Sequence, residues 1–269
     1  MVELNKPNYG GIEPPEYEKR IKSPSQERVL FEQLVGPLVE ECLAANLGDE
    51  KIKLLALGLG YGYELDHPEI KNNPRIQIIG LDISKEMLNE GMRARLADAL
   101  NQPFLICADN EKLPLRSEIA DCALAVNNMI YKPWYVLRSL HRLLKPGAKC
   151  IVNPSIFSEK RRERILKSGC QLRPTRLVID ADGQERYDTD ADPIQPHDQA
   201  QFTMQVVDHR NYIHEKIRAC ADQVVFSNRA EAEHMITLAG FEIAAKKVIT
   251  YQKGQREYKS HFYILRKPD

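Results

Sequence analysis

LLALGLGYG, residues 54–62, is an apolar run that passes into glycine at every second position. A short continuous apolar run is typical of a buried parallel strand, and the glycines indicate a turn at its carboxyl end. Open α/β sheets bind their ligands at that edge, where the order of the strands reverses. The stretch therefore predicts a strand that leads into a ligand-binding loop.

Strand-like and helix-like segments alternate on both sides of this stretch, which predicts the fold class. The strand-like runs are short, apolar and rich in β-branched residues, and the helical segments carry apolar residues at a period of about 3.6. Alternation of this kind predicts an α/β, doubly wound, mostly parallel sheet. The expected strands are 51–57, 75–82, 102–108, 119–126 and 148–153, and the expected helices are 25–47, 84–100 and 133–147.

The spacing of the glycines limits the ligand. A dinucleotide-binding loop needs a third glycine at the sixth position, where the helix packs closely on the strand, and here Gly58 and Gly60 are followed by Tyr63. A phosphate-binding P-loop is also excluded, because no Gly-Lys-Ser/Thr follows.

Two acidic residues at strand ends indicate a nucleoside. Asp82 ends the second predicted strand, some twenty residues after the glycines, where a carboxylate can accept both hydroxyls of a ribose. Asp109 and Asn110 follow the third strand and are placed to meet an adenine edge.

Four motifs in this order resemble the class I S-adenosylmethionine (SAM)-dependent methyltransferases, and most closely the type 11 group. They are LALGLGYG, the Leu-Asp pair at 81–82, ADNEKLPL followed by IADCALA, and LLKPG. The resemblance covers residues 51–154 well and 227–269 loosely. It implies a Rossmann-like seven-stranded sheet with an antiparallel last strand, SAM as cofactor, and S-adenosylhomocysteine (SAH) as product.

Carried over by position, the resemblance assigns the cofactor-binding residues. The glycines would face the methionine part, Asp82 the ribose, and Asp109 with the backbone of Asn110 the adenine; the glycines are Gly58, Gly60 and Gly62, and Ile83 is a further cofactor-binding residue. The family usually has an acidic residue two positions before the first glycine, but this chain has Ala56. Glu64 or Asp66 would supply the missing charge, or both are solvated.

The acceptor side is expected after the fourth strand, in VNNMIYKPWY. Asn127, a candidate for both cofactor contact and catalysis, and Tyr131 are expected to line the methyl-transfer site. His209 is the preferred candidate for a general base, because a histidine pKa lies near neutrality. Trp134 and His141 are expected to be structural residues of the helix that follows.

The chain is expected to have four parts. These are an N-terminal helical cap (1–50), the SAM-binding α/β core (51–154), an insertion that covers the acceptor pocket (155–226), and a helix with the closing strands of the core (227–269). Within the insertion, LVIDADGQERY indicates a hairpin that turns at Asp182-Gly183.

Charge and cysteine content restrict the partners. Lysine plus arginine equals aspartate plus glutamate, 38 of each, so the net charge favours neither nucleic acid nor an anionic membrane. Neither a signal peptide nor a long apolar run is found, which indicates a cytoplasmic protein. The spacing of the cysteines does not suggest a metal site, and Cys107, Cys122 and Cys150 are expected to be buried thiols.

The leading hypothesis is a SAM-dependent methyltransferase with a small-molecule acceptor, and a homodimer is left open. Two alternatives remain. In one, SAM itself is the substrate of a different reaction, an idea motivated by Ala56. In the other, the chain is a catalytically silent binding or scaffold subunit with the SAM-binding fold.

Overall fold

The structure is a computed structural model, which describes the chain from residue 28 to 269 with internal gaps. The described ranges are 28–60, 62–91, 97–109, 112–126, 132–156, 163, 166–167, 171–188, 198–208, 223–253 and 256–269.

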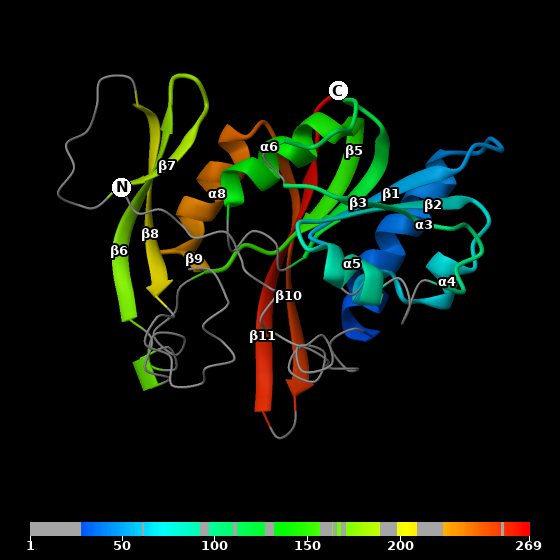
Figure 1. The fold of residues 1–269 in the computed structure, drawn as a ribbon, viewed down its shortest axis with the longest axis horizontal. Coiled ribbons are helices and arrows are strands. Elements are labelled where there is room, and N and C mark those ends of the chain that lie inside the picture. The colour runs from blue at the N-terminus through cyan, green and yellow to red at the C-terminus, as the bar shows by residue number, and fades with distance from the viewer. Residues whose placement is uncertain are drawn as a thin grey trace.

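A seven-stranded sheet forms the centre of the molecule, in the order β10-β11-β5-β4-β1-β2-β3 (Figure 1). Strands β1 to β5 are parallel, β11 is antiparallel to β5, and β10 is antiparallel to β11. The predicted doubly wound, mostly parallel sheet with an antiparallel last strand is thus confirmed. The strands are β1 Ile52–Leu57, β2 Ile76–Asp82, β3 Phe104–Cys107, β4 Ala120–Ala125, β5 Leu144–Val152, β10 Glu242–Lys253 and β11 Arg256–Arg266.

Helices cover both faces of this sheet because side chains alternate along its strands. In β1, Leu54 and Ala56 pack with the N-terminal helices, whereas Leu55 and Leu57 pack on the opposite face. The first face carries the π-helical turn η2 Phe31–Val35, α3 Gly36–Ala45, the 3₁₀ turn η3 Tyr63–Leu65, α4 Pro68–Lys71 and α5 Lys85–Gly91. The second face carries α6 Pro133–Leu143 and α8 Arg229–Leu238.

A second, four-stranded antiparallel sheet is formed by the insertion, in the order β7-β6-β8-β9. The predicted hairpin is present, with Gly183 at a φ of 74° in its turn. Buried residues of this sheet, such as Leu177 and Phe202, belong to the same hydrophobic cluster as α6 and α8. The strands are β6 Gln171–Asp180, β7 Glu185–Asp188, β8 Asp198–Asp208 and β9 Gln223–Phe226.

Two local expectations need correction. Cys107 is exposed, because β3 is the edge strand, while Cys122 and Cys150 are buried as expected. The helix expected over 133–147 ends at Leu143, because β5 begins at Leu144 and includes the Pro-Gly pair of LLKPG. The helix α8 is capped by Asn228, whose side chain accepts the backbone N–H of Glu231 at 3.0 Å.

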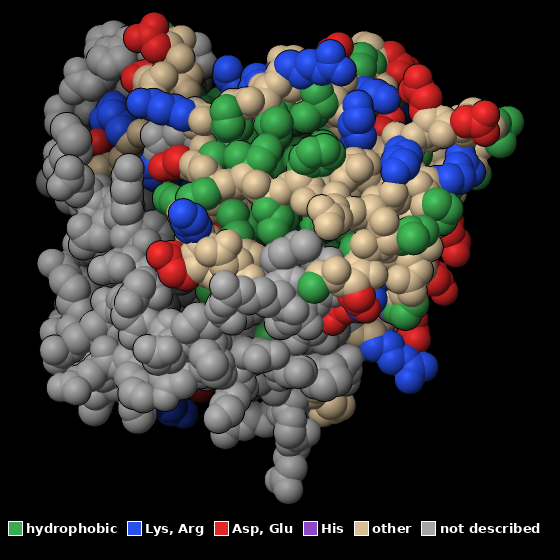
Figure 2. All heavy atoms as spheres, turned by 45° about the vertical axis from the view of Figure 1, so that its right-hand side comes forward, with side chains coloured by type: hydrophobic (Ala, Val, Ile, Leu, Met, Phe, Trp, Pro, Cys, Tyr) green, Lys and Arg blue, Asp and Glu red, His purple; other side chains and the backbone are tan. Residues whose placement is uncertain are grey.

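On the face of the described chain that Figure 2 shows, neither basic nor acidic side chains predominate. Basic and acidic side chains both occur there, and hydrophobic side chains gather near its centre. In the part of the chain that the structure describes, the helices are all too short or too polar to cross a bilayer.

Asp121 of β4 bonds to residues of β1 and β5. These bonds lie at the amino end of the parallel strands, opposite the glycine loop. Its Oδ2 accepts the backbone N–H of Lys53 at 2.7 Å, and its Oδ1 accepts Lys145 Nζ at 2.6 Å, while the side chain is only 8% exposed. We expect Asp121→Ala to lower the free energy of unfolding by about 1.5 kcal/mol, because it leaves a partly buried N–H without its acceptor. Urea denaturation measures this loss. Asp121→Asn keeps an acceptor oxygen and should recover part of it, and equal losses in both variants would contradict the explanation.

Candidate active site

The loop after β1 is held in a shape that glycine favours. Gly58, Gly60 and Gly62 have φ angles of 65°, 53° and 71°, all in the left-handed region. The N–H of Gly62 donates to the carbonyl of Leu59 at 2.8 Å, and the N–H of Leu59 donates to the carbonyl of Leu81 at 2.8 Å. The first strand therefore ends in a tight loop that is bonded to the end of the second.

Asp82 bonds directly to this loop. Its Oδ2 accepts the N–H of Gly60 at 2.8 Å, and its Oδ1 accepts the N–H of Ser84 at 2.9 Å. Burial raises the pKa of the Asp82 carboxyl, and the N–H groups of Ser84, Gly60 and Ile83 oppose that rise. A desolvated acceptor with fixed orientation thus lies at the carboxyl end of β2, beside the glycines.

Around Asp82, the glycine loop presents Gly60 without close backbone neighbours. A Cβ built on Gly60 would meet only the tip of Met87, at 3.7 Å, so the open side of the loop is not filled by backbone. Ile83 is 37% exposed, and Asp109, which follows β3, is partly buried. Since Asp82 of β2 pairs with Cys107 of β3, the ends of these two strands form one continuous edge.

Several predicted site residues lie outside the described part of the chain. Gly58, Gly60, Gly62, Asp82 and Ile83 are brought together at one edge, and Asp109 follows the neighbouring strand. Outside the described residues are Asn110, Asn127, Tyr131 and His209. Their roles stay predictions.

Comparison with known proteins identifies this arrangement. Residues 55–152 match the family described as methyltransferase domain, and this range holds the glycine loop, Asp82 and Asp109. Residues 55–152 form a methyltransferase domain. The resemblance noted in the sequence is thereby confirmed for this range.

Solved structures share the fold of this methyltransferase domain at low sequence identity. The magnesium protoporphyrin IX methyltransferase of Synechocystis PCC 6803, solved with SAH, is 14% identical, with a TM-score of 0.56 over 97% of this chain and 95% of that chain. A SAM-dependent methyltransferase from Clostridium acetobutylicum ATCC 824 is 13% identical, with a TM-score of 0.53 over 94% and 95%. The [4+2]-cyclase SpnF is 15% identical, with a TM-score of 0.51 over 88% and 82%. A search among curated proteins finds no match.

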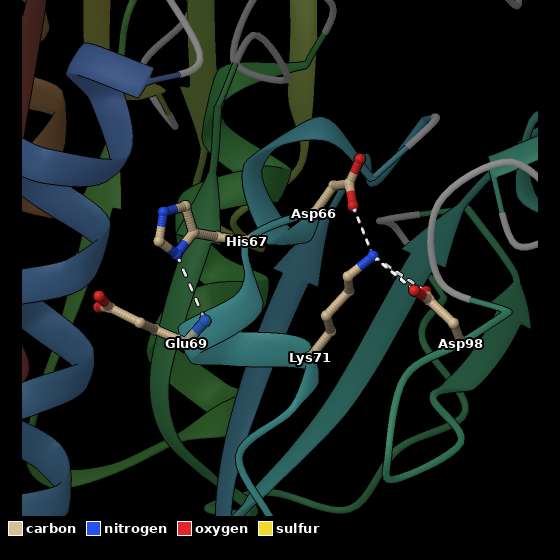
Figure 3. A network of polar contacts seen from close by, with 5 residues as sticks. All are labelled: Asp66, His67, Glu69, Lys71 and Asp98. Carbon is tan, nitrogen blue, oxygen red and sulfur yellow. Dashed lines mark hydrogen bonds and ion pairs between the residues drawn. The ribbon is translucent and has the colours of Figure 1, made fainter.

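The methyltransferase domain departs from its family pattern at Ala56. This residue is 4% exposed, packs in the core on the α3 side, and offers only a methyl group. Asp66 was one candidate to replace the missing acid, and its Oδ1 forms an ion pair with Lys71 Nζ at 3.1 Å (Figure 3). The same lysine contacts Asp98 at 2.9 Å, so Asp66 belongs to a charge network around α4. The side chain of Glu64, the other candidate, lies outside the described residues.

Sequence reasoning missed a polar cluster where the second sheet meets α6. Trp134 Nε1 donates to the carbonyl of Gly183 at 3.0 Å, and the Tyr135 hydroxyl donates to Gln184 Oε1 at 3.0 Å. Trp134 is 3% exposed, which confirms its expected structural role, and His141, half-buried with its edge toward Phe241, is structural as well. The available signal was the hairpin at Asp182-Gly183, which places Glu185 and Tyr187 on the same side of a strand.

Proposed function

We propose that this chain transfers the methyl group of SAM to a small-molecule acceptor, and that the second sheet helps to select that acceptor. The observation that carries the proposal is the docking of the β6–β7 turn on the first residues of α6. Helix α6 begins directly after the segment that follows β4, so the turn lies near the carboxyl ends of the parallel strands. Ligands of open α/β sheets bind at that edge.

The residues of the core fit a SAM site by their chemistry. Asp82 offers a buried carboxylate for a pair of hydroxyls, and the left-handed glycines keep Cβ atoms away from the cofactor. When bound, SAM supplies a methyl group on a positively charged sulfur. The main task of this chain is then to orient the acceptor and exclude water, which contributes roughly 7–11 kcal/mol in well-aligned reactions.

A transfer assay with methyl-labelled SAM tests the proposal. The purified protein is incubated with pools of small hydroxyl-, amine- and thiol-bearing compounds, with tRNA, and with a denatured protein extract. We expect label only in small-molecule products, because the net charge is zero and the second sheet adjoins the predicted transfer site. Label in tRNA or protein with none in the small molecules would contradict the acceptor class.

A second candidate is a reaction of SAM other than methyl transfer. Ala56 favours it, because it replaces the family's acidic residue. Binding the methionine end of SAM without that acid would alter which atom of SAM is exposed. The [4+2]-cyclase SpnF shares the fold, and its name describes a chemistry other than methyl transfer. Product analysis with SAM alone separates the two: a new nucleoside fragment formed without any acceptor supports the second candidate.

A further inference from the structure

The carboxyl group of Glu185, a residue of the second sheet, lies at the start of α6. Glu185 is the first residue of β7, and its backbone N–H donates to the Tyr135 hydroxyl at 3.4 Å. The Tyr187 hydroxyl donates to Glu185 Oε1. The other oxygen, Oε2, is buried and has no hydrogen-bond partner in the part of the chain that the structure describes.

The charged and titratable groups around this carboxyl come from both elements. Tyr187 lies on β7, Tyr135 on α6, and Lys132 directly precedes α6. Asp109 and Asp180 act on the pKa of Tyr135, which places the cluster within electrostatic reach of the residue expected at the adenine. Arg138 lies over the Trp134 ring, 5.6 Å from its centre.

Burial dominates the electrostatics of the cluster. Desolvation raises the pKa of Glu185 to about 7, while Tyr187, Lys132 and the N–H groups of Tyr135 and Trp134 oppose the rise. Burial and the nearby Glu185 carboxyl raise the pKa of Tyr187 well above its usual value. A carboxyl that titrates near neutrality exchanges a proton easily at physiological pH.

A buried acceptor atom without a partner is costly in a folded protein and is usually satisfied by a ligand or water. Here that atom lies at the α6 start, beside the segment where the methyl acceptor is expected. We propose that Glu185 Oε2 takes the proton from the hydroxyl or N–H group of the acceptor during methyl transfer. The inference rests on the proposed function, and it narrows the substrate class to acceptors that carry a removable proton.

The step balances as a displacement. The acceptor's O–H or N–H bond breaks and its proton moves to Oε2. The acceptor's electron pair forms the bond to the methyl carbon, and the carbon–sulfur bond breaks with its pair left on the sulfur of SAH. Tyr187 holds Oε1 and fixes the orientation of the carboxyl, and so acts as a positioning residue.

The test compares Glu185→Gln with the wild type in the labelled-SAM assay. We expect wild-type turnover to rise with pH through about 7. Turnover in Glu185→Gln should be at least roughly 100-fold lower and should lose this rise, because general base catalysis contributes about 10²–10⁴. SAM affinity should be unchanged in a calorimetric titration. Glu242→Gln, an exposed glutamate on β10, is the matched control and should behave like the wild type.

Tyr187→Phe provides a second variant that leaves the carboxyl in place. The Tyr187 hydroxyl lowers the pKa of Glu185, so its removal should move the pH profile of turnover to higher pH. A merely structural role of the cluster would change the rate without moving the profile.

A readout that does not need turnover is the pH dependence of stability. The pKa of Glu185 is about 7 in the folded protein and lower in the unfolded chain, so its favourable contribution is complete below its unfolded value and is lost as pH rises through about 7. The urea midpoint of the wild type should therefore fall between pH 5 and pH 8 by more than that of Glu185→Gln.

The outcomes separate this inference from the proposed function. Absence of SAM binding by the wild type in the calorimetric titration would overturn the proposed function itself. SAM binding with an unchanged pH profile in Glu185→Gln would overturn only the role of Glu185. Transfer restricted to groups without a removable proton, such as thioethers, would also overturn the role of Glu185, whereas SAM binding without transfer to any pool would overturn the proposed methyl transfer itself.

Discussion

Asp82→Ala will weaken SAM binding by about 100-fold or more. The variant removes a carboxylate that can accept two ribose hydroxyls, and hydrogen bonds to a charged group contribute about 1.5–3 kcal/mol each. It also frees the N–H of Gly60, which Asp82 holds at 2.8 Å. Isothermal titration calorimetry measures the change, and a 100-fold loss corresponds to about 2.7 kcal/mol.

Two further variants separate the two effects of Asp82. Asp82→Asn keeps an oxygen that can accept the Gly60 N–H but has no charge, so an intermediate affinity indicates that the carboxylate contacts the ribose. Asp98→Ala is the matched control, because Asp98 has a 70% exposed side chain and pairs with Lys71 away from the loop. Wild-type affinity in Asp82→Ala would show that the cofactor does not bind at this strand end.

Gly80→Val will lower the free energy of unfolding by about 3 kcal/mol. A Cβ at this position would lie 2.3 Å from Leu59 Cδ2 and 2.9 Å from Leu105 Cδ2, both shorter than real contacts. Gly80 lies inside β2 and pairs with Ala56 on one side and Leu105 on the other, so the added atoms overpack the centre of the sheet. Thermal and urea denaturation measure the loss.

The same variant should also weaken SAM binding, because Leu59 lies inside the glycine loop and must move. Gly80→Ala adds the Cβ alone and should give a smaller loss of both stability and affinity. Gly48→Ala is the control, since a Cβ there meets nothing within 4 Å. Unchanged stability in Gly80→Val would show that Leu59 and Leu105 shift without cost.

The core of this fold is readable in the sequence because its strands are buried on both faces. Residues such as Leu54 and Leu55 both face a core, so the run is continuously apolar and needs no knowledge of its neighbours. The glycine loop was readable for a related reason, since its three left-handed positions favour glycine. Asp82 followed from its place at the end of such a run.

The second sheet was not readable beyond its hairpin. Its central pairing joins Leu177 to Phe202, across the turn and a further segment, so no local signal marks the register. The cluster at Glu185 depends in addition on bonds between residues 49 positions apart in the chain, such as Trp134 and Gly183. Its raised pKa is a property of burial, which a sequence pattern of charged and turn residues does not reveal.

The turn between β6 and β7 has an evolutionary consequence. It meets α6 through side chains of Trp134 and Tyr135, while the grip on the nucleoside rests on Asp82 and the glycine loop of another part of the sheet. Mutations in the insertion can therefore accumulate without weakening cofactor binding, as long as the turn keeps its contacts with α6. Under the proposed function, descendants of one ancestral gene would in this way acquire new acceptors by diverging in a single segment of the chain.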